Sequence, residues 1–231
     1  MTAKIIAVCN QKGGTGKTTV SMQLAGSLAR RGGRVMVVDA DPQGTATRWA
    51  ATAPDDRAFP AVVMGLSAAG GKLHREVRKL VGDYDYIVID CPPAADSPVP
   101  QSALLVADLA LVPIIPSPPD LWAAVGIRHI IENAGDINEG LRSRLVVNMC
   151  QSTAIAKDAL EILPEFGAEV CEAKLRLRTA YRQSAIDGQS VHAGGARASA
   201  AVEEVEALTS EVLTILNPAA GRRRGASGPR G

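Results

Sequence analysis

The sequence predicts one α/β domain over residues 1–216, built as a mostly parallel twisted sheet with helices on both faces. Short apolar runs alternate along the chain with segments whose apolar residues recur at helical spacing. Several of these runs are continuously apolar, as parallel strands buried on both faces are. A glycine-rich loop joins the first run to the first helical segment, at residues 10–19. Such loops lie at the carboxyl edge of parallel sheets, so we expect the functional site there.

The glycine-rich loop predicts a phosphate-binding site. It follows the apolar run 5–9 and precedes apolar residues at four-residue spacing in 20–28. Strand, loop and helix in this order are the context that a phosphate-binding motif requires. Glycines let successive N–H groups point at phosphate oxygens, and the helix N-terminus adds its positive dipole end. Lys17 is expected to reach the β- and γ-phosphates of a bound nucleotide, and the Thr18 hydroxyl to hold Mg²⁺.

The loop departs from the pattern G-x-x-x-x-G-K-[ST] at one place. Gln11 stands where the first glycine belongs, and a second lysine, Lys12, follows it. A dinucleotide fingerprint, G-x-G-x-x-G, is the competing interpretation. Gly14 and Gly16 begin that pattern, but Thr19 occupies the third glycine position, and the lysine and threonine before it are left unexplained. The loop therefore favours a nucleoside triphosphate.

Two later apolar runs end in acidic residues. Residues 35–38 lead into Asp39-Ala40-Asp41-Pro42-Gln43-Gly44, and the run 84–90 ends at Asp90, followed by Cys91-Pro92-Pro93. Apolar residues followed by a terminal Asp form a Walker B pattern, whose carboxylate holds a Mg²⁺-bound water. We expect the strand that ends at Asp90 to lie beside the strand that precedes the loop.

These three motifs resemble the ParA/MinD family of dimerising ATPases, which carries a deviant Walker A motif. The resemblance covers nearly the whole chain to about residue 216 and implies a P-loop ATPase. It implies that Lys12 reaches the partner's phosphates in a nucleotide-sandwich homodimer. It also implies that Asp41 orients or activates the attacking water, that Asp39 supports the Mg²⁺ shell and that Asn148 contacts adenine. The loop residues expected to bind the nucleotide are Gly13, Gly14, Thr15, Gly16, Lys17, Thr18 and Thr19.

The remaining segments continue the alternation of strands and helices. Residues 109–115 form a predicted strand despite Pro113, which is unfavourable inside a sheet. The next segment, 116–121, resembles one that lies near the dimer interface in small plasmid-type ParA proteins. The other expected elements are a polar loop at 51–57, strands at 58–64, 144–149 and 168–172, and helices at 72–81, 120–134, 155–165 and 198–216.

The charge distribution limits how the chain could bind nucleic acid. Residues 1–216 hold 21 basic and 24 acidic side chains, a net charge of −3, so any DNA contact must come from a local patch. Aromatic residues make up 3%, which argues against stacking platforms for single strands. One dense basic stretch contains Lys174, Arg176, Arg178 and Arg182. It is either a solvated face or, as the resemblance implies, a contact for DNA of any sequence. The Gly/Ala/Arg-rich residues 217–231 are expected to be a disordered basic tail.

The resemblance implies a positioning ATPase of the cytoplasm that associates with the nucleoid. ATP would drive dimerisation, the dimer would bind double-stranded DNA without sequence preference, and a small cargo-adaptor protein would stimulate hydrolysis. The cargo would be a plasmid, a chromosome or a protein body such as the carboxysome. No apolar stretch approaches the ~20 residues of a membrane span.

Two alternatives come from the same family. A MinD-like membrane-cycling regulator needs a closing helix with a basic polar face, whereas residues 198–216 carry Glu203, Glu204, Glu206 and Glu211. A relative of the nitrogenase iron protein needs cluster-ligating cysteines, and the four widely spaced cysteines lack that pattern. The sequence therefore favours a positioning ATPase without a membrane partner.

Overall fold

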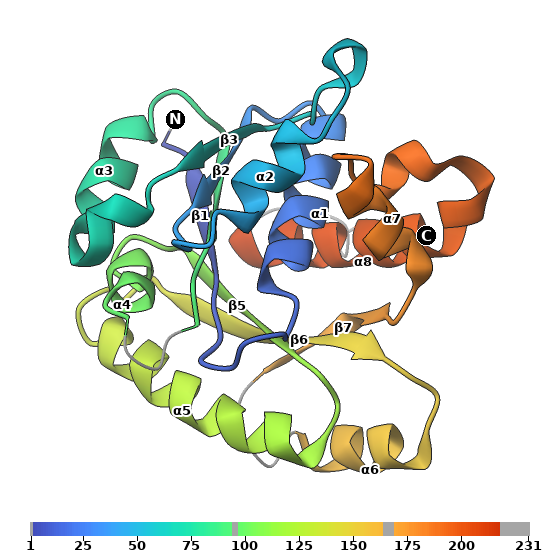
Figure 1. The fold of residues 1–231 in the computed structure, drawn as a ribbon. Helices are drawn as coiled ribbons and strands as arrows, with labels where there is room; N and C mark the ends of the chain where they lie inside the picture. Colours follow the sequence, from blue (N-terminus) through green and yellow to red (C-terminus); the bar gives the residue numbers. More distant parts are fainter. Residues whose placement is uncertain (1, 94–96, 164–168, 218–231) are drawn as a thin grey trace, which may run out of the picture.

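The computed structural model describes residues 2–93, 97–163 and 169–217 as one α/β unit around a seven-stranded sheet (Figure 1). Every strand pairing in the sheet is parallel, and the strand order is β3-β2-β4-β1-β5-β6-β7. This confirms the predicted fold class. β4 lies beside β1, so the expected neighbourhood of the Asp90 strand and the loop strand is also confirmed. The strands are β1 (Lys4–Val8), β2 (Val35–Asp39), β3 (Val62–Gly65), β4 (Tyr86–Asp90), β5 (Leu109–Ile114), β6 (Arg142–Cys150) and β7 (Val170–Arg176).

Helices cover both faces of the sheet because successive residues of each buried strand point to opposite faces. In β1, Ile5 and Ala7 join the apolar cluster beneath α3, α4, α5 and α6, whereas Ile6 and Val8 join the cluster beneath α1, α2, α7 and α8 (Figure 1). The helices are α1 (Lys17–Arg30), α2 (Thr45–Ala51), α3 (Leu73–Leu80), α4 (Val99–Leu104), α5 (Pro118–Gly135), α6 (Ala154–Ile162), α7 (Thr179–Ile186) and α8 (Ser199–Leu216), with 3-10 segments η1 (Asp55–Arg57), η2 (Ser67–Lys72) and η4 (Val191–Ala198).

Pro113 lies inside β5 without breaking the sheet. β1 pairs with β5 only as far as Leu111, so Pro113, which has no N–H to donate, lies beyond that ladder. Its carbonyl oxygen accepts a hydrogen bond of 2.7 Å from Asn10 Nδ2. The proline thus lies past the end of the β1 ladder, where the chain of β1 leaves the sheet to form the phosphate loop, and β5 stays paired with β6 through Ile114.

The outer edge of β7 is covered by α8. Glu211 accepts hydrogen bonds from the backbone N–H groups of Glu172 and Ala173, both at 3.0 Å, and Glu204 accepts one from the N–H of Arg176 at 3.0 Å. Two acidic side chains one heptad apart therefore bind N–H groups that an edge strand would otherwise leave open. The sequence-based strand at 168–172 was too short, because β7 extends through Arg176 and includes part of the basic stretch.

Candidate nucleotide-binding site

The loop before α1 is held in an unusual backbone conformation. Gly14 and Gly16 have φ angles of 78° and 86°, a region that side chains disfavour, and α1 begins at Lys17. A Cβ on Gly16 would lie 2.2 Å from Asn148 Nδ2, at the end of β6. That nitrogen donates a hydrogen bond of 2.8 Å to the carbonyl oxygen of Thr15. The side chain from β6 thus clamps the loop, and only glycine fits at position 16.

The first turn of α1 meets the end of β4. Thr18 Oγ1 donates to Asp90 Oδ2 at 2.7 Å, and Ser21 Oγ lies 3.2 Å from Asp90 Oδ1. Lys17 is 7% exposed, and its Nζ donates to the carbonyl oxygen of Lys12 at 3.0 Å. The structure therefore brings together the loop lysine, the loop threonine and the strand-end acid that the sequence predicted. Ser21 is a member of this cluster that the motifs did not reveal.

Burial changes the pKa values of both ionisable groups in this cluster. It raises the pKa of Asp90 from 3.8 to about 7; the charge of Asp39 adds to the increase, and the hydrogen bonds from Thr18 and Ser21 oppose it. Burial also lowers the pKa of Lys17, against the attraction of Asp90. Two buried charges of opposite sign thus face one site, which is typical of a place where charged ligands are bound.

The two acids after β2 have different surroundings. Asp39 is 1% exposed, and its Oδ2 accepts from the N–H and the hydroxyl of Thr47, at 2.8 Å and 2.9 Å. It is the register partner of Asp90 in the sheet. Asp41 lies two residues further along, partly exposed, and its Oδ1 accepts from the N–H of Gln43 at 2.9 Å. Asp39 is therefore fixed in the site, whereas Asp41 lies on the loop above it.

The oxygen atoms around Asp90 fit a hard divalent cation. Thr18 supplies a hydroxyl, and Asp90 and Asp39 supply carboxylates at adjacent strand ends, which are ligands that Mg²⁺ prefers. Over the described residues, no cluster of three or more His, Cys, Asp or Glu is arranged to hold a metal. A cation here would thus rely on the hydroxyl, on water and on phosphate oxygens, as Mg²⁺ usually does when it binds with a nucleotide.

The second lysine lies at the outer side of the loop. The Lys12 side chain is 39% exposed, and its Nζ lies 2.9 Å from Asp120 Oδ2, near the start of α5. Lys12 thus points away from the cluster that Lys17 serves. Asp120 was not among the predicted site residues. An acid in the first turn of a helix ordinarily stabilises that helix, so its sequence position offered no separate signal.

A cavity of about 170 Å³ opens beside the clamped loop, bounded by Thr19 and Asn148. Met149, which also lines it, has a φ of 50°, in the region that favours glycine. Three residues of the predicted DNA-binding set, Arg176, Arg178 and Arg182, line the same cavity. The structure therefore brings most of the basic stretch to the nucleotide side of the molecule.

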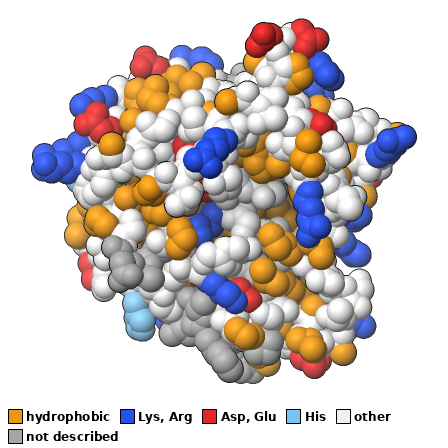
Figure 2. Space-filling model, viewed as in Figure 1, with side chains coloured by type: hydrophobic (Ala, Val, Ile, Leu, Met, Phe, Trp, Pro, Cys, Tyr) orange, Lys and Arg blue, Asp and Glu red, His pale blue; other side chains and the backbone are white. Residues whose placement is uncertain are grey.

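The basic residues of the predicted DNA-binding set differ in whether an acidic side chain of α8 already binds them. Arg178 binds Glu204 Oε1 through Nε at 2.9 Å and through Nη2 at 2.7 Å, and Arg176 Nε lies 3.9 Å from the same oxygen. Lys174 and Arg182 are exposed. On the face that Figure 2 shows, Lys and Arg side chains are spread out, several of them close to Asp or Glu. Arg178 is thus an internal partner of α8 as much as a surface charge.

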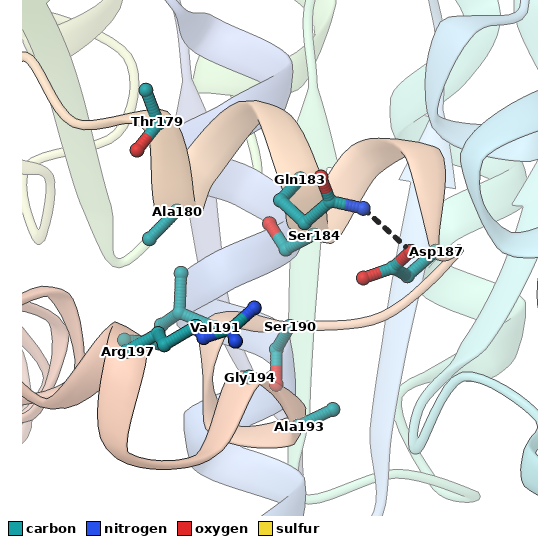
Figure 3. Close-up of a pocket in the computed structure, with 11 residues that line it drawn as sticks. Thr179, Ala180, Gln183, Ser184, Asp187, Ser190, Val191, Ala193, Gly194 and Arg197 are labelled. Carbon is teal, nitrogen blue, oxygen red and sulfur yellow. Dashed lines mark hydrogen bonds between the residues drawn. The ribbon is translucent and has the colours of Figure 1, made fainter.

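A larger cavity of about 530 Å³ lies between α7 and η4, lined by Ser184, Asp187 and Arg197 among others (Figure 3). Gln183 Nε2 donates to Asp187 Oδ1 at 2.9 Å at its rim. The buried Gln23 of α1 donates to Ser184 Oγ at 2.8 Å and fixes this wall of the cavity to the helix that follows the phosphate loop.

The parallel sheet, the glycine loop ahead of α1 and the acids at two neighbouring strand ends define a nucleotide-binding α/β protein of the P-loop class. Comparison with known sequences gives the family. A profile of the CobQ/CobB/MinD/ParA nucleotide binding domain matches residues 6–191, so the chain belongs to this family. The predicted resemblance to ParA/MinD proteins is thereby confirmed.

Individual relatives agree with this assignment. The chain is 34% identical over 209 residues to the maintenance of carboxysome distribution protein A of Halothiobacillus neapolitanus, covering 90% of this chain and 95% of that protein. It is 30% identical over 183 residues to the sporulation initiation inhibitor protein Soj of Bacillus subtilis, covering 62% and 70%. A solved structure, an ATP complex of a McdA variant from Cyanothece, superposes with a TM-score of 0.78 over 91% of this chain and 96% of that one, at 19% identity. The last comparison supports the fold.

Proposed function

We propose that this protein is a ParA-type positioning ATPase that dimerises on ATP, binds nucleoid DNA without sequence preference and distributes an intracellular cargo. The division of labour between its two lysines carries the proposal. Lys17 is buried in the cluster around Asp90, whereas Lys12 lies outside that cluster. One nucleotide in its own loop needs only the first lysine, so the second is available for a nucleotide held by another subunit.

Within one subunit the residues divide the work as follows. The backbone of residues 13–19 and the Lys17 ammonium hold the phosphates. Thr18, Asp39 and Asp90 hold Mg²⁺, which neutralises phosphate charge when it is bound. Asp41, on the loop above them, positions the attacking water. Asn148, which already fixes the loop, contacts adenine in the adjoining cavity.

DNA binding would come from exposed basic side chains that two subunits present together. Each phosphate neutralised releases counterions, so doubling the contacts should make binding both tighter and more dependent on salt. Lys174 and Arg182 are exposed and suit this role, whereas Arg178 is engaged by Glu204. A small adaptor protein bound to the cargo would stimulate hydrolysis and release the dimer from DNA.

The kind of cargo is proposed from the share of each relative's length that matches this chain. The two carboxysome-distribution relatives, from Halothiobacillus neapolitanus and Gloeobacter kilaueensis, are covered over 95% and 83% of their lengths. The chromosome-partitioning ParA of Myxococcus xanthus is covered over 62%. This favours a protein body over a chromosome as the cargo.

The membrane-cycling alternative is less well supported by the contacts of α8. Glu204 and Glu211 bind the backbone of β7, and Glu206 binds Arg31, the residue that follows α1, at 2.6 Å. The acidic face of α8 therefore serves the folded body. Over the part of the chain that the structure describes, no helix is both long and apolar enough to cross a bilayer.

The test is nucleotide-dependent DNA binding. Fluorescence anisotropy of a labelled random-sequence duplex is measured across a salt series with ATP, with ADP and without nucleotide, and light scattering gives the oligomeric state. We expect binding and dimers with ATP, and loss of DNA binding in Lys174→Glu plus Arg182→Glu with dimers retained. Arg75→Glu plus Arg78→Glu makes the same charge change on α3, on the other side of the molecule from β7 and α7 (Figure 1), and should keep DNA binding. Equal affinity in all three nucleotide states would refute the proposal.

A further inference from the structure

Asp120 is a buried carboxylate with an incomplete set of partners. Asp120 is 3% exposed and lies near the start of α5. Its Oδ2 accepts from Ser117 Oγ at 2.5 Å and lies 2.9 Å from Lys12 Nζ. Its Oδ1 is buried and, among the described atoms, has no hydrogen-bond partner. Burying a carboxylate is costly unless it is paired, so the ion pair with the Lys12 ammonium compensates for the burial of Asp120.

The loop and α5 also touch at a second point. A Cβ placed on Gly126 of α5 would lie 2.1 Å from Gln11 Oε1, so the residue before Lys12 lies directly against the helix. The backbone of Lys12 is fixed as well, because its N–H donates to Asn10 Oδ1 at 3.1 Å and its carbonyl accepts from Lys17 Nζ at 3.0 Å. The loop is therefore anchored, and what remains free to change at Lys12 is the direction of the side chain.

One ammonium thus has two competing acceptors. The proposed function assigns the Lys12 Nζ to the phosphates of a partner subunit, and in this structure the same atom pairs with Asp120 of its own chain. A triphosphate carries more charge than a diphosphate, so it competes better for the ammonium. We propose that Asp120, supported by Ser117, is a positioning residue that retains Lys12 within its own subunit until a triphosphate-loaded partner displaces it. This inference rests on the proposed function.

The two supporting residues should have opposite effects when changed. Asp120→Asn removes the charge that retains Lys12. The ATP-bound dimer should therefore form at a protein concentration that is lower by about a factor of ten or more, which is the effect expected when the competing state loses one charge-assisted hydrogen bond. Ser117→Ala removes the other donor to Asp120 and leaves its charge more dependent on Lys12. That variant should dimerise less readily than the wild type.

The experiment is a dilution series followed by light scattering, with a non-hydrolysable ATP analogue, Mg²⁺ and, separately, ADP. Asp136→Asn, an exposed acid at the C-terminal end of the same helix, is the matched control and should leave the dimer unchanged. A wild-type protein that stays monomeric would refute the proposed function. The role of Asp120 would be overturned if the wild type dimerises but Asp120→Asn dimerises no more readily than it does. It would also be overturned if Asp120→Asn and Ser117→Ala change dimerisation in the same direction.

A second measurement reads the pairing without the dimer. In nucleotide-free protein, the reactivity of the Lys12 amine toward an acetylating reagent is followed by peptide mass spectrometry, with the exposed Lys174 as internal reference. Asp120→Asn should raise the reactivity of Lys12 severalfold relative to Lys174, because a paired ammonium is less available. Thermal unfolding confirms that each variant is folded. Unchanged reactivity of Lys12 in folded Asp120→Asn protein would overturn the inference.

Discussion

Replacing Asp90 by Asn should stabilise the nucleotide-free protein. Asp90 is 0% exposed, and burial raises its pKa from 3.8 to about 7. That difference corresponds to about 4 kcal/mol of unfolding free energy when the group is ionised in the native state. An Asn oxygen keeps the acceptor for Thr18, and its amide can donate to Ser21, which leaves both neighbours with a partner. The gain should therefore approach the cost of the buried charge.

The sign of the pH dependence follows from the direction of that pKa change. Between about pH 4 and pH 7 the native protein binds a proton at Asp90 that the unfolded chain has released, so the free energy of unfolding falls as pH rises through this window. Asn does not titrate. The advantage of Asp90→Asn over the wild type should be near zero at pH 4 and grow to about 4 kcal/mol at pH 8.

The measurement is urea unfolding of nucleotide-free protein at pH 5 and pH 8, repeated at pH 8 with Mg²⁺ and ATP. Mg²⁺ and ATP should stabilise the wild type more than the variant, because Asp90→Asn weakens the support for the cation. Asp136→Asn, which removes an exposed acid at the end of α5, is the control, and its stability should stay within about 0.5 kcal/mol of the wild type at both pH values. If Asp90→Asn is less stable than the wild type at pH 8, the ionised Asp90 carboxylate stabilises the fold and the reasoning is refuted.

Three further outcomes are expected. Lys17→Ala should weaken ATP binding at least tenfold by calorimetry, since it removes a charged donor from the phosphate site. Asp41→Ala should bind ATP normally but hydrolyse it at least tenfold more slowly and accumulate as a dimer, as phosphate-release assays and light scattering would show; normal turnover would reassign the water-positioning role. Burial raises the pKa of Glu206, but hydrogen bonds from Ser27 and Arg31, with one from His192, outweigh it and lower the pKa to about 2. Stability should thus fall, by about 1 kcal/mol after solvent screening, as pH drops from about 4.5 toward 2, and Glu206→Gln should lack this acid-side dependence in thermal unfolding.

The sequence predicted the central strands and the site cluster because each carries a strong local signal. A buried parallel strand is a continuous apolar run, and the phosphate-binding motif is recognised by the strand before it and the helix after it. The short helices α2 and α4 were not predicted. α2 spans seven residues, and its N-cap, Gly44, makes no side-chain capping bond, so no start signal precedes it. α4 spans six residues and has Pro100 near its start, which fits a turn equally well.

The contacts that the sequence did not predict are long-range polar ones. Lys12 and Asp120 lie 108 positions apart, and Arg178 and Glu204 lie 26 apart; neither pair has a periodicity that marks it. The basic stretch was treated as one surface, but it is split between the end of β7, which carries Lys174 and Arg176, and α7, which carries Arg182, with Arg178 between them bound to Glu204. Such pairings depend on the fold and are set only when the sheet is assembled.

The hydrogen bonds that Glu204 and Glu211 accept from β7 have a consequence for how this surface can change during evolution. The glutamates bind main-chain N–H groups, which every residue except proline possesses. The contact between α8 and β7 therefore does not depend on the outward-facing side chains of that strand. Mutations at positions 172 and 174 can add or remove positive charge at little cost to folding, so the charge of this surface can change during evolution while the sheet stays intact.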